Sequence, residues 1–163
     1  MASAIMLPPT TTLSALNSNC PALGEVCYYG GKFYRFVKHV NAVTVVAGHV
    51  ALFTAANTGG TIVTNDTAGG ATAALTGKVA GIYVSVPAAN EYCFIQCSGI
   101  ALVLGGGSVA ANDWVVAGTD GTMVTYSDGA EELVAGFALD ADDTANDPLG
   151  VSALFHCVLN PIL

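Results

Sequence analysis

The chain contains the same strand pattern twice. Three short segments of the first half match three of the second in the same order: Ala47–Leu52 with Ala111–Val116, Gly60–Asp66 with Gly121–Asp128, and Val79–Val84 with Val134–Leu139. Each half also opens with an aromatic-rich segment, Lys32–Val37 in the first and Glu91–Gln96 in the second. Ordered matches of this kind are hard to obtain by chance, so the fold must be built from two related sets of elements.

From Tyr28 onward, β-branched and aromatic residues gather in short runs separated by Gly, Asn and Asp. Such runs are typical of strands, and the glycines provide the positive φ angles of turns. We expect strands over 32–37, 42–46, 50–54, 61–65, 79–86, 92–97, 100–104, 113–117, 123–126, 133–139 and 152–159. Duplicated strands of this kind usually pair into one closed barrel or sandwich, which removes exposed edges. The expected fold class is therefore all-β, a compact barrel or sandwich of two diverged strand repeats with an extended N-terminal arm.

The expected domain organisation follows from composition. Residues 1–27 are rich in Pro, Thr and Ser with irregular apolar residues, which is typical of an extended arm. This arm is either disordered or ordered against a neighbouring molecule. The β-domain is expected over residues 28–163, with repeat halves at about 30–86 and 90–139 and a closing strand at 152–159.

The chain has few charged residues for its length. Hydrophobic residues make up 53% and charged residues 10%, yet no apolar run approaches the roughly 20 residues of a membrane span. A surface of small neutral side chains suits contact with other chains, although a compact monomer with a Thr/Ser/Asn surface is the alternative. The net charge of −8 excludes the basic footprint of a nucleic-acid-binding protein.

The charges are distributed unevenly along the chain. Three of the four cationic residues lie within Lys32–Lys38, whereas nine of the twelve acidic residues lie from Asp113 onward. This asymmetry could direct the two ends toward different partners, or it could reflect a solvated strand edge and a solvated loop.

The cysteines indicate a reduced protein. An odd number of thiols and no basic segment at the N-terminus are typical of synthesis in a cytoplasm; the five are Cys20, Cys27, Cys93, Cys97 and Cys157. Along one strand, Cys93 and Cys97 would lie about 13 Å apart, too far to bridge or to share a metal ion. They are expected to be small buried apolar residues.

The sequence offers few candidate catalytic residues. His39, His49 and His156 lack the spacing of a metal-binding pair, and His156 and Cys157 point to opposite faces of a strand. His49 occupies the repeat position of Asp113, just after a turn, which favours a polar surface role. No catalytic, cofactor-binding or metal-binding residue is therefore expected.

One acidic segment is the nearest approach to a site. Residues Asp140–Asp147 could bind Ca²⁺ through carboxylate oxygens, but they lack the glycine and the terminal glutamate of an EF-hand loop. A solvated loop is the favoured interpretation.

The second half carries a family resemblance. The segments Gly77–Val84, Asn90–Gly99, Val109–Gly121 and Val134–Leu139 resemble the capsid decoration (cement) proteins of tailed bacteriophages. In that family an aromatic-hydrophobic-Gln-x-Ser-Gly strand is followed by a glycine-turned β segment and a Val-x-Gly-x-Ala strand. The resemblance covers roughly residues 30–158, and Cys93-Phe94 departs from the Gly-Trp that relatives more often carry.

The resemblance implies a structural, non-enzymatic protein without cofactors. It would be made in the host cytoplasm and would bind the outside of an assembled head. Its partners would be the major capsid protein and further copies of itself, as a homotrimer or homodimer. Many weak contacts spread over several capsid subunits would then add together.

Two other functions are compatible with the residues. The first is a glycan- or receptor-binding module of a virion head fibre, in which aromatic side chains stack on sugars; the candidates are Tyr28, Tyr29, Tyr83, Tyr126 and Trp114. The second is a small hydrolase that uses a cysteine or the Asp-rich segment as a metal site.

Overall fold

The computed structural model of the protein describes residues 7–40, 44–54, 60–66, 74–106, 109–118, 121–127, 134–141 and 154–159, with the backbone alone for 74–78 and 154–159. The elements of these residues are strands: β1 (Thr12–Leu13), β2 (Val26–Tyr29), β3 (Lys32–His39), β4 (Val50–Thr54), β5 (Ile62–Thr64), β6 (Ala74–Tyr83), β7 (Tyr92–Leu104), β8 (Trp114–Ala117), β9 (Met123–Thr125), β10 (Gly136–Ala138) and β11 (Leu154–Leu159). The described part of the chain has no helix long and apolar enough to cross a membrane.

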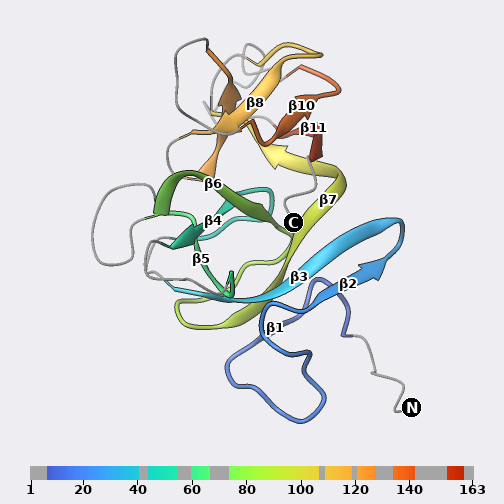
Figure 1. Cartoon of the computed structure of the whole chain (residues 1–163), viewed down its shortest axis with the longest axis vertical. Helices are drawn as coiled ribbons and strands as arrows, with labels where there is room; N and C mark the ends of the chain where they lie inside the picture. Colours follow the sequence, from blue (N-terminus) through green and yellow to red (C-terminus); the bar gives the residue numbers. More distant parts are fainter. Residues whose placement is uncertain are drawn as a thin grey trace.

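The longest strand, β7, links the two halves of the molecule. The strand order is β2-β3-β5-β4-β6-β7-β11-β10-β8-β9, and β3 also pairs with β7. Residues 92–98 of β7 pair with β3, and residues 99–104 pair with β11. The change of partner falls at Gly99, which has a φ of +87°. Figure 1 shows β7 running from the lower part of the molecule, beside β3, to the upper part beside β11.

In the first copy, five strands close into a ring. β3 pairs in parallel with β5, and antiparallel pairs then connect β5 to β4, β4 to β6, β6 to β7 and β7 back to β3. The interior is filled by buried side chains, namely Val37, Val45, Ala51, Val63, Ala80, Tyr83, Cys93 and Ile95. Closure leaves no free edge among these five strands, as expected of a barrel, but the ring closes within one copy and not from both together.

The second copy repeats this arrangement. Antiparallel pairs connect β7 to β11, β11 to β10, β10 to β8 and β8 to β9, and a parallel bridge between Gly105 and Met123 completes the ring. The pair Trp114–Phe137 occupies the position of the pair Val50–Ile82 in the first copy. The all-β fold class predicted from the sequence is confirmed.

Strand pairing assigns β7 differently from the sequence match. Residues 92–98 pair with β3 and β6 and so complete the first copy, while residues 99–104 open the second. The segment Glu91–Gln96 is therefore the closing strand of the first copy, not the counterpart of Lys32–Val37. The two segments look alike in composition because they are neighbours that share one buried surface.

In the hairpins β4–β5 and β8–β9, the equivalence of residues between the copies is shifted by one residue from the sequence match. Phe53 faces Val63 in the first copy, and the equivalent residue Ala117 faces Met123 in the second. The sequence match instead pairs Val63 with Val124. Because a slip of one residue exchanges the two faces of a strand, it decides which side chain enters the core, and both Val63 and Met123 are fully buried.

The same four-residue turn precedes β2, β4, β7 and β8. In each turn the backbone N–H of the fourth residue donates to the carbonyl oxygen of the first, and the fourth side chain accepts the N–H of the first; the turns are Ala22–Glu25, Val46–His49, Ala88–Glu91 and Ala110–Asp113. The third residue has positive φ in all of them, which explains why it is Gly24, Gly48, Asn90 or Asn112.

One of these turns overturns a predicted strand. Residues 44–46, the described part of the strand expected over 42–46, are not in a strand. Val46 begins the turn that ends at His49, and the edges of β3 are already occupied by β5 and β7 at Lys38. No free edge remains there for another strand.

The N-terminal segment packs on its own chain. Within residues 7–27, β1 pairs with β7, placing Thr12 opposite Cys93. The side chains of Leu7 and Leu13 pack against the buried aromatic residues Phe36 and Phe94. Three turns, closed by the N–H groups of Thr11, Cys20 and Glu25, interrupt the segment, and its described apolar contacts are made with this domain. Strand β2 begins at Val26, two residues before the expected start of the β-domain at Tyr28.

Candidate interaction surfaces

The two cysteines of β7 are buried thiols. Cys93 is fully buried and Cys97 is 7% exposed, so the expectation that both are buried is confirmed. Burial, with a smaller contribution from Glu91, raises the pKa of the Cys93 thiol to about 12. Burial also raises the pKa of Cys97. Both groups are therefore neutral thiols at physiological pH, whereas the thiolate is the reactive form.

The described histidines lie inside the protein. Nδ1 of His39 is 2.8 Å from the hydroxyl oxygen of Tyr83, and the two rings meet edge to face. Burial raises the pKa of Tyr83 well above its ordinary value, which keeps the hydroxyl protonated. Both side chains are fully buried within the first copy, so this pair has a structural role.

The prediction of a surface role for His49 is wrong. His49 is only 8% exposed, and its Nδ1 accepts the N–H of Val46 at 3.3 Å. The amide nitrogen of Asn65 lies 3.2 Å from the same atom. In the second copy, Asp113 accepts the N–H of Ala110 at 3.1 Å and the hydroxyl of Thr125 at 2.9 Å. The two residues close equivalent turns, but His49 is more deeply buried because it lies where the two copies meet.

Metal-binding groups do not gather in the described residues. No group of three or more His, Cys, Asp or Glu side chains there could hold a metal ion. Of the predicted acidic segment Asp140–Asp147, residues 142–147 lie outside the described part of the chain, as does the side chain of His156.

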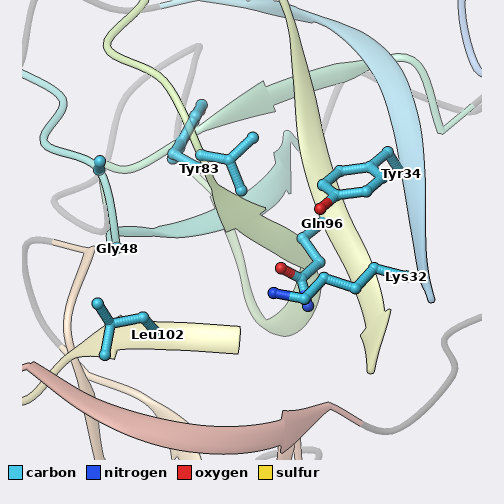
Figure 2. Close-up of a pocket in the computed structure, with 8 residues that line it drawn as sticks. Lys32, Tyr34, Gly48, Tyr83, Gln96 and Leu102 are labelled. Atoms are coloured by element: carbon cyan, nitrogen blue, oxygen red, sulfur yellow. The ribbon is translucent and has the colours of Figure 1, made fainter. Parts of the chain in front are cut away.

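A pocket of about 260 Å³ lies beside the junction of the two copies; it is lined by Lys32, Tyr34, Ala47, Gly48, Tyr83, Val84, Gln96 and Leu102. Figure 2 shows the side chains of Lys32, Tyr34 and Gln96 on one side of the space, with Leu102 across from them. The amide nitrogen of Gln96 donates to the carbonyl oxygens of Ser98 and Ile100, at 3.2 and 2.9 Å. Gln96 thereby supports the bend at Gly99, so its position in the pocket is explained by the fold.

Large apolar side chains are exposed along the edge hairpin β2–β3. Tyr28 is 61% exposed, Tyr29 52%, and both Val26 and Phe33 45%. The rings of Tyr28 and Phe33 contact each other with centroids 5.1 Å apart. We call these four residues the hairpin patch. Aromatic residues grouped on an exposed edge are characteristic of protein interfaces.

A second exposed group lies on the outer face of the second copy. Trp114 is 56% exposed, and its ring meets that of Phe137 edge to face with centroids 6.0 Å apart. We call this pair the β8–β10 face. The two groups lie in different copies of the repeat.

The aromatic residues predicted to stack on sugars divide into three classes. Tyr28, Tyr29 and Trp114 are exposed, as that hypothesis needs. Tyr126 is half-buried. The prediction is wrong for Tyr83, which is fully buried because it fills the interior of the first ring.

Comparisons with known proteins give a distant structural similarity. No protein-family model matches the chain, and no curated protein does. Among solved structures, the chain is similar to the N base of the head fibre gp8.5 of bacteriophage phi29, with a TM-score of 0.48 and 15% identity over 78% of this chain and 93% of that chain.

Proposed function

We propose that the protein is a structural virion protein that binds the outer surface of an assembled phage head and stabilises contacts between major capsid subunits. The observation that carries the proposal is the hairpin patch. Its four large side chains lie at the edge of the sheet, where they contact solvent unless a partner covers them. The resemblance of residues 30–158 to capsid decoration proteins agrees with this role.

The chemistry of the described residues supports a role that is not enzymatic. The thiols of Cys93 and Cys97 have raised pKa values. Two of the three cations of β3 are engaged with aromatic rings: the guanidinium carbon of Arg35 is 5.7 Å from the ring centre of Phe53, and Nζ of Lys38 is 5.9 Å from that of Tyr92. These groups stabilise the surface of the first copy, as a rigid binding module requires.

Co-sedimentation with undecorated capsids tests the proposal. We expect the wild-type protein to co-sediment, and the double variant Tyr28→Ser/Phe33→Ser to lose at least about tenfold in affinity, because it removes two aromatic anchors. Val86→Ser is the matched control, since Val86 is 58% exposed but lies outside the hairpin patch. Failure of the wild-type protein to bind, or equal binding by the double variant, would contradict the proposal.

A glycan- or receptor-binding module of a head fibre is the second candidate. The exposed rings of Tyr28 and Trp114 are the observation that favours it, because sugar rings stack on exposed aromatic faces. A glycan array would decide this, with Trp114→Ser and Tyr28→Ser as the variants that should lose any signal. An array without hits would exclude the glycan-binding form.

A further inference from the structure

The bend of β7 at Gly99 leaves a pocket between the two copies. Gln96 lies before the bend, where β7 pairs with β3, whereas Leu102 lies after it, where β7 pairs with β11. The two side chains lie on opposite sides of the pocket (Figure 2). Its volume of about 260 Å³ is just below the range of pockets that hold drug-sized ligands, so it suits a ligand about the size of one sugar ring.

One wall of this pocket is polar. Tyr34 lies directly opposite Gln96 in the β3–β7 pair, and Lys32 is two residues before Tyr34, so the three side chains share one face of the sheet. Leu102 provides an apolar surface across from them, and it is 46% exposed, so the pocket opens to solvent. A few convergent polar groups that face an apolar surface are characteristic of small-molecule sites.

The amide oxygen of Gln96 is held in position by the fold. The side chain is only 2% exposed, and its amide nitrogen donates to the carbonyl oxygens of Ser98 and Ile100, at 3.2 and 2.9 Å. These two bonds use both hydrogens of the amide. The nitrogen therefore faces the backbone, and the oxygen is left on the side of the pocket, where it can accept a hydrogen bond from a ligand (Figure 2).

Lys32 supplies the charge of the pocket. It is half-buried, and it is the only charged residue among the described ones that line this space. Because no carboxylate among these residues neutralises the ammonium group, the pocket favours an anionic ligand. The ligand must also donate a hydrogen bond to the oxygen of Gln96. A second ammonium group would be repelled by Lys32, whereas a hydroxyl group meets this requirement.

We propose that the pocket binds an acidic sugar, whose carboxylate pairs with the ammonium group of Lys32 and whose neighbouring hydroxyl donates to the amide oxygen of Gln96. A uronic acid ring carries these two groups on adjacent carbon atoms. Its C–H groups then contact Leu102. The site is separate from the exposed rings of Tyr28 and Trp114. The proposal does not depend on capsid binding, because free sugars test it on the purified protein.

An exposed aromatic ring lies beside the pocket. Tyr29 is directly opposite Lys32 in the β2–β3 hairpin, so its side chain lies on the face of the sheet that carries Tyr34. Burial, with smaller contributions from Cys27 and Tyr29, raises the pKa of Tyr34, in agreement with this placement. Tyr29 is 52% exposed, and sugar rings stack on exposed aromatic faces. The second unit of an acidic disaccharide is therefore expected to contact this ring.

Titration of the ¹⁵N-labelled full-length protein with D-glucuronate and with D-galacturonate tests the proposal. We expect at least one of them to shift the side-chain amide signals of Gln96 in the NMR spectrum. D-glucose, which lacks the carboxylate, should bind at least about tenfold more weakly, because a hydrogen bond to a charged group is lost. No shift with either acid, or equal affinity for D-glucose, would overturn the proposal.

Variants of two lysines on β3 test the role of the charge. Lys32→Met should weaken binding by at least about tenfold. Lys38→Met is the matched control and should leave binding unchanged, because Nζ of Lys38 lies 5.9 Å from the ring centre of Tyr92 and the residue does not line the pocket. Equal affinities of the two variants would overturn the proposal.

Two further variants test the shape of the site. Ala47 is an exposed residue that lines the pocket, so the added carbons of Ala47→Leu occupy its space without entering the core. This variant should remain folded by circular dichroism and lose the shift of the Gln96 signals, and an unchanged shift would contradict the assignment of the pocket. Digalacturonate should bind more tightly than galacturonate, and Tyr29→Ser should remove this gain. A gain that persists in Tyr29→Ser would contradict the expected stacking on this ring.

Discussion

In the first copy, β4 and β6 place Val50 and Ile82 in a core shared with the second copy, whereas in the second copy the matching strands leave Trp114 56% exposed. The order of strand pairing is the same in the two copies, as are the turns that end at His49 and Asp113. The comparison shows that the repeat preserves backbone pairing, while the side chains have diverged according to their surroundings.

The interiors of the two rings have diverged as well. Tyr83 fills the first ring and forms a 2.8 Å contact with His39, whereas the equivalent residue of the second ring is Ala138. Ala51 in the first ring corresponds to Val115 in the second. Large and small side chains are thus redistributed between the copies. A closed ring must keep its interior filled, but any of its strands can contribute the volume.

Val50 and Trp114 occupy the same repeat position, one on a buried face and the other on an exposed face. Replacing each residue by the other is the strongest test of this difference. Val50→Trp should reduce the free energy of unfolding by more than about 3 kcal/mol, because the fully buried position has no room for an indole. Trp114→Val should change it by less than about 1 kcal/mol, since the side chain is 56% exposed. Urea denaturation of both variants measures this, and similar costs would contradict the assignment of covered and uncovered faces.

The glycine shared by the two Val-Ala-Gly strands provides a second test. Gly81 has a φ of +156°, and an ideal Cβ there would lie 2.5 Å from the carbonyl oxygen of Gln96. Gly81→Ala should therefore cost about 3 kcal/mol, because backbone of β7 must move. Gly136, its counterpart, does not have a positive φ, so Gly136→Ala should cost less. Thermal unfolding monitored by circular dichroism compares them, and equal costs would show that the copies are strained alike.

The equivalent turns provide a third test. His49→Ala should cost about 2 kcal/mol, because it leaves the buried amide of Asn65 without the ring nitrogen 3.2 Å away. Asp113→Ala removes the same kind of turn bond at a half-buried position and should cost about 1 kcal/mol. Asp113→Asn is the control, since its amide oxygen can still accept the N–H of Ala110. A greater cost for Asp113→Ala than for His49→Ala would contradict the different depths of the turns.

Strand content was predictable because it depends on local composition. The strand expected over 50–54 matches β4, and most other strands differ from their predicted ends by a few residues. The repeat was also visible, since its turn residues Gly48 and Asn112 are required by positive φ. The features that could not be predicted are those that depend on pairing between strands distant in the sequence. No local signal shows that β7 belongs to both copies, or that Met123 takes the place of Val63.

The exposed surfaces were harder to predict than the strands. Tyr83 and Trp114 occupy similar strand contexts in the sequence, yet one is fully buried and the other is exposed. Which face of each strand points into a ring depends on the register of distant partners. The signal that was available is the replacement of Val50 by Trp114 at the same repeat position. A large aromatic residue where the first copy has a small buried one marks a position with different surroundings.

The smallest expected effect concerns pH, and it arises in the core of the first copy. Burial raises the pKa of the Cys93 thiol from its ordinary value of 9.0 to about 12. Between these values the unfolded chain releases a proton that the folded chain retains, so stability falls as pH rises above 9. By pH 10 the loss should be about 1 kcal/mol, measured by urea denaturation at pH 8 and 10. In Cys93→Ala, whose side chain cannot ionise, this part of the loss should disappear, and any remainder reports other groups such as Tyr83, whose pKa is also raised by burial. An unchanged slope in Cys93→Ala would show that the thiol titrates alike in the folded and unfolded chain, and that the first ring admits more water at β7 than its packing indicates.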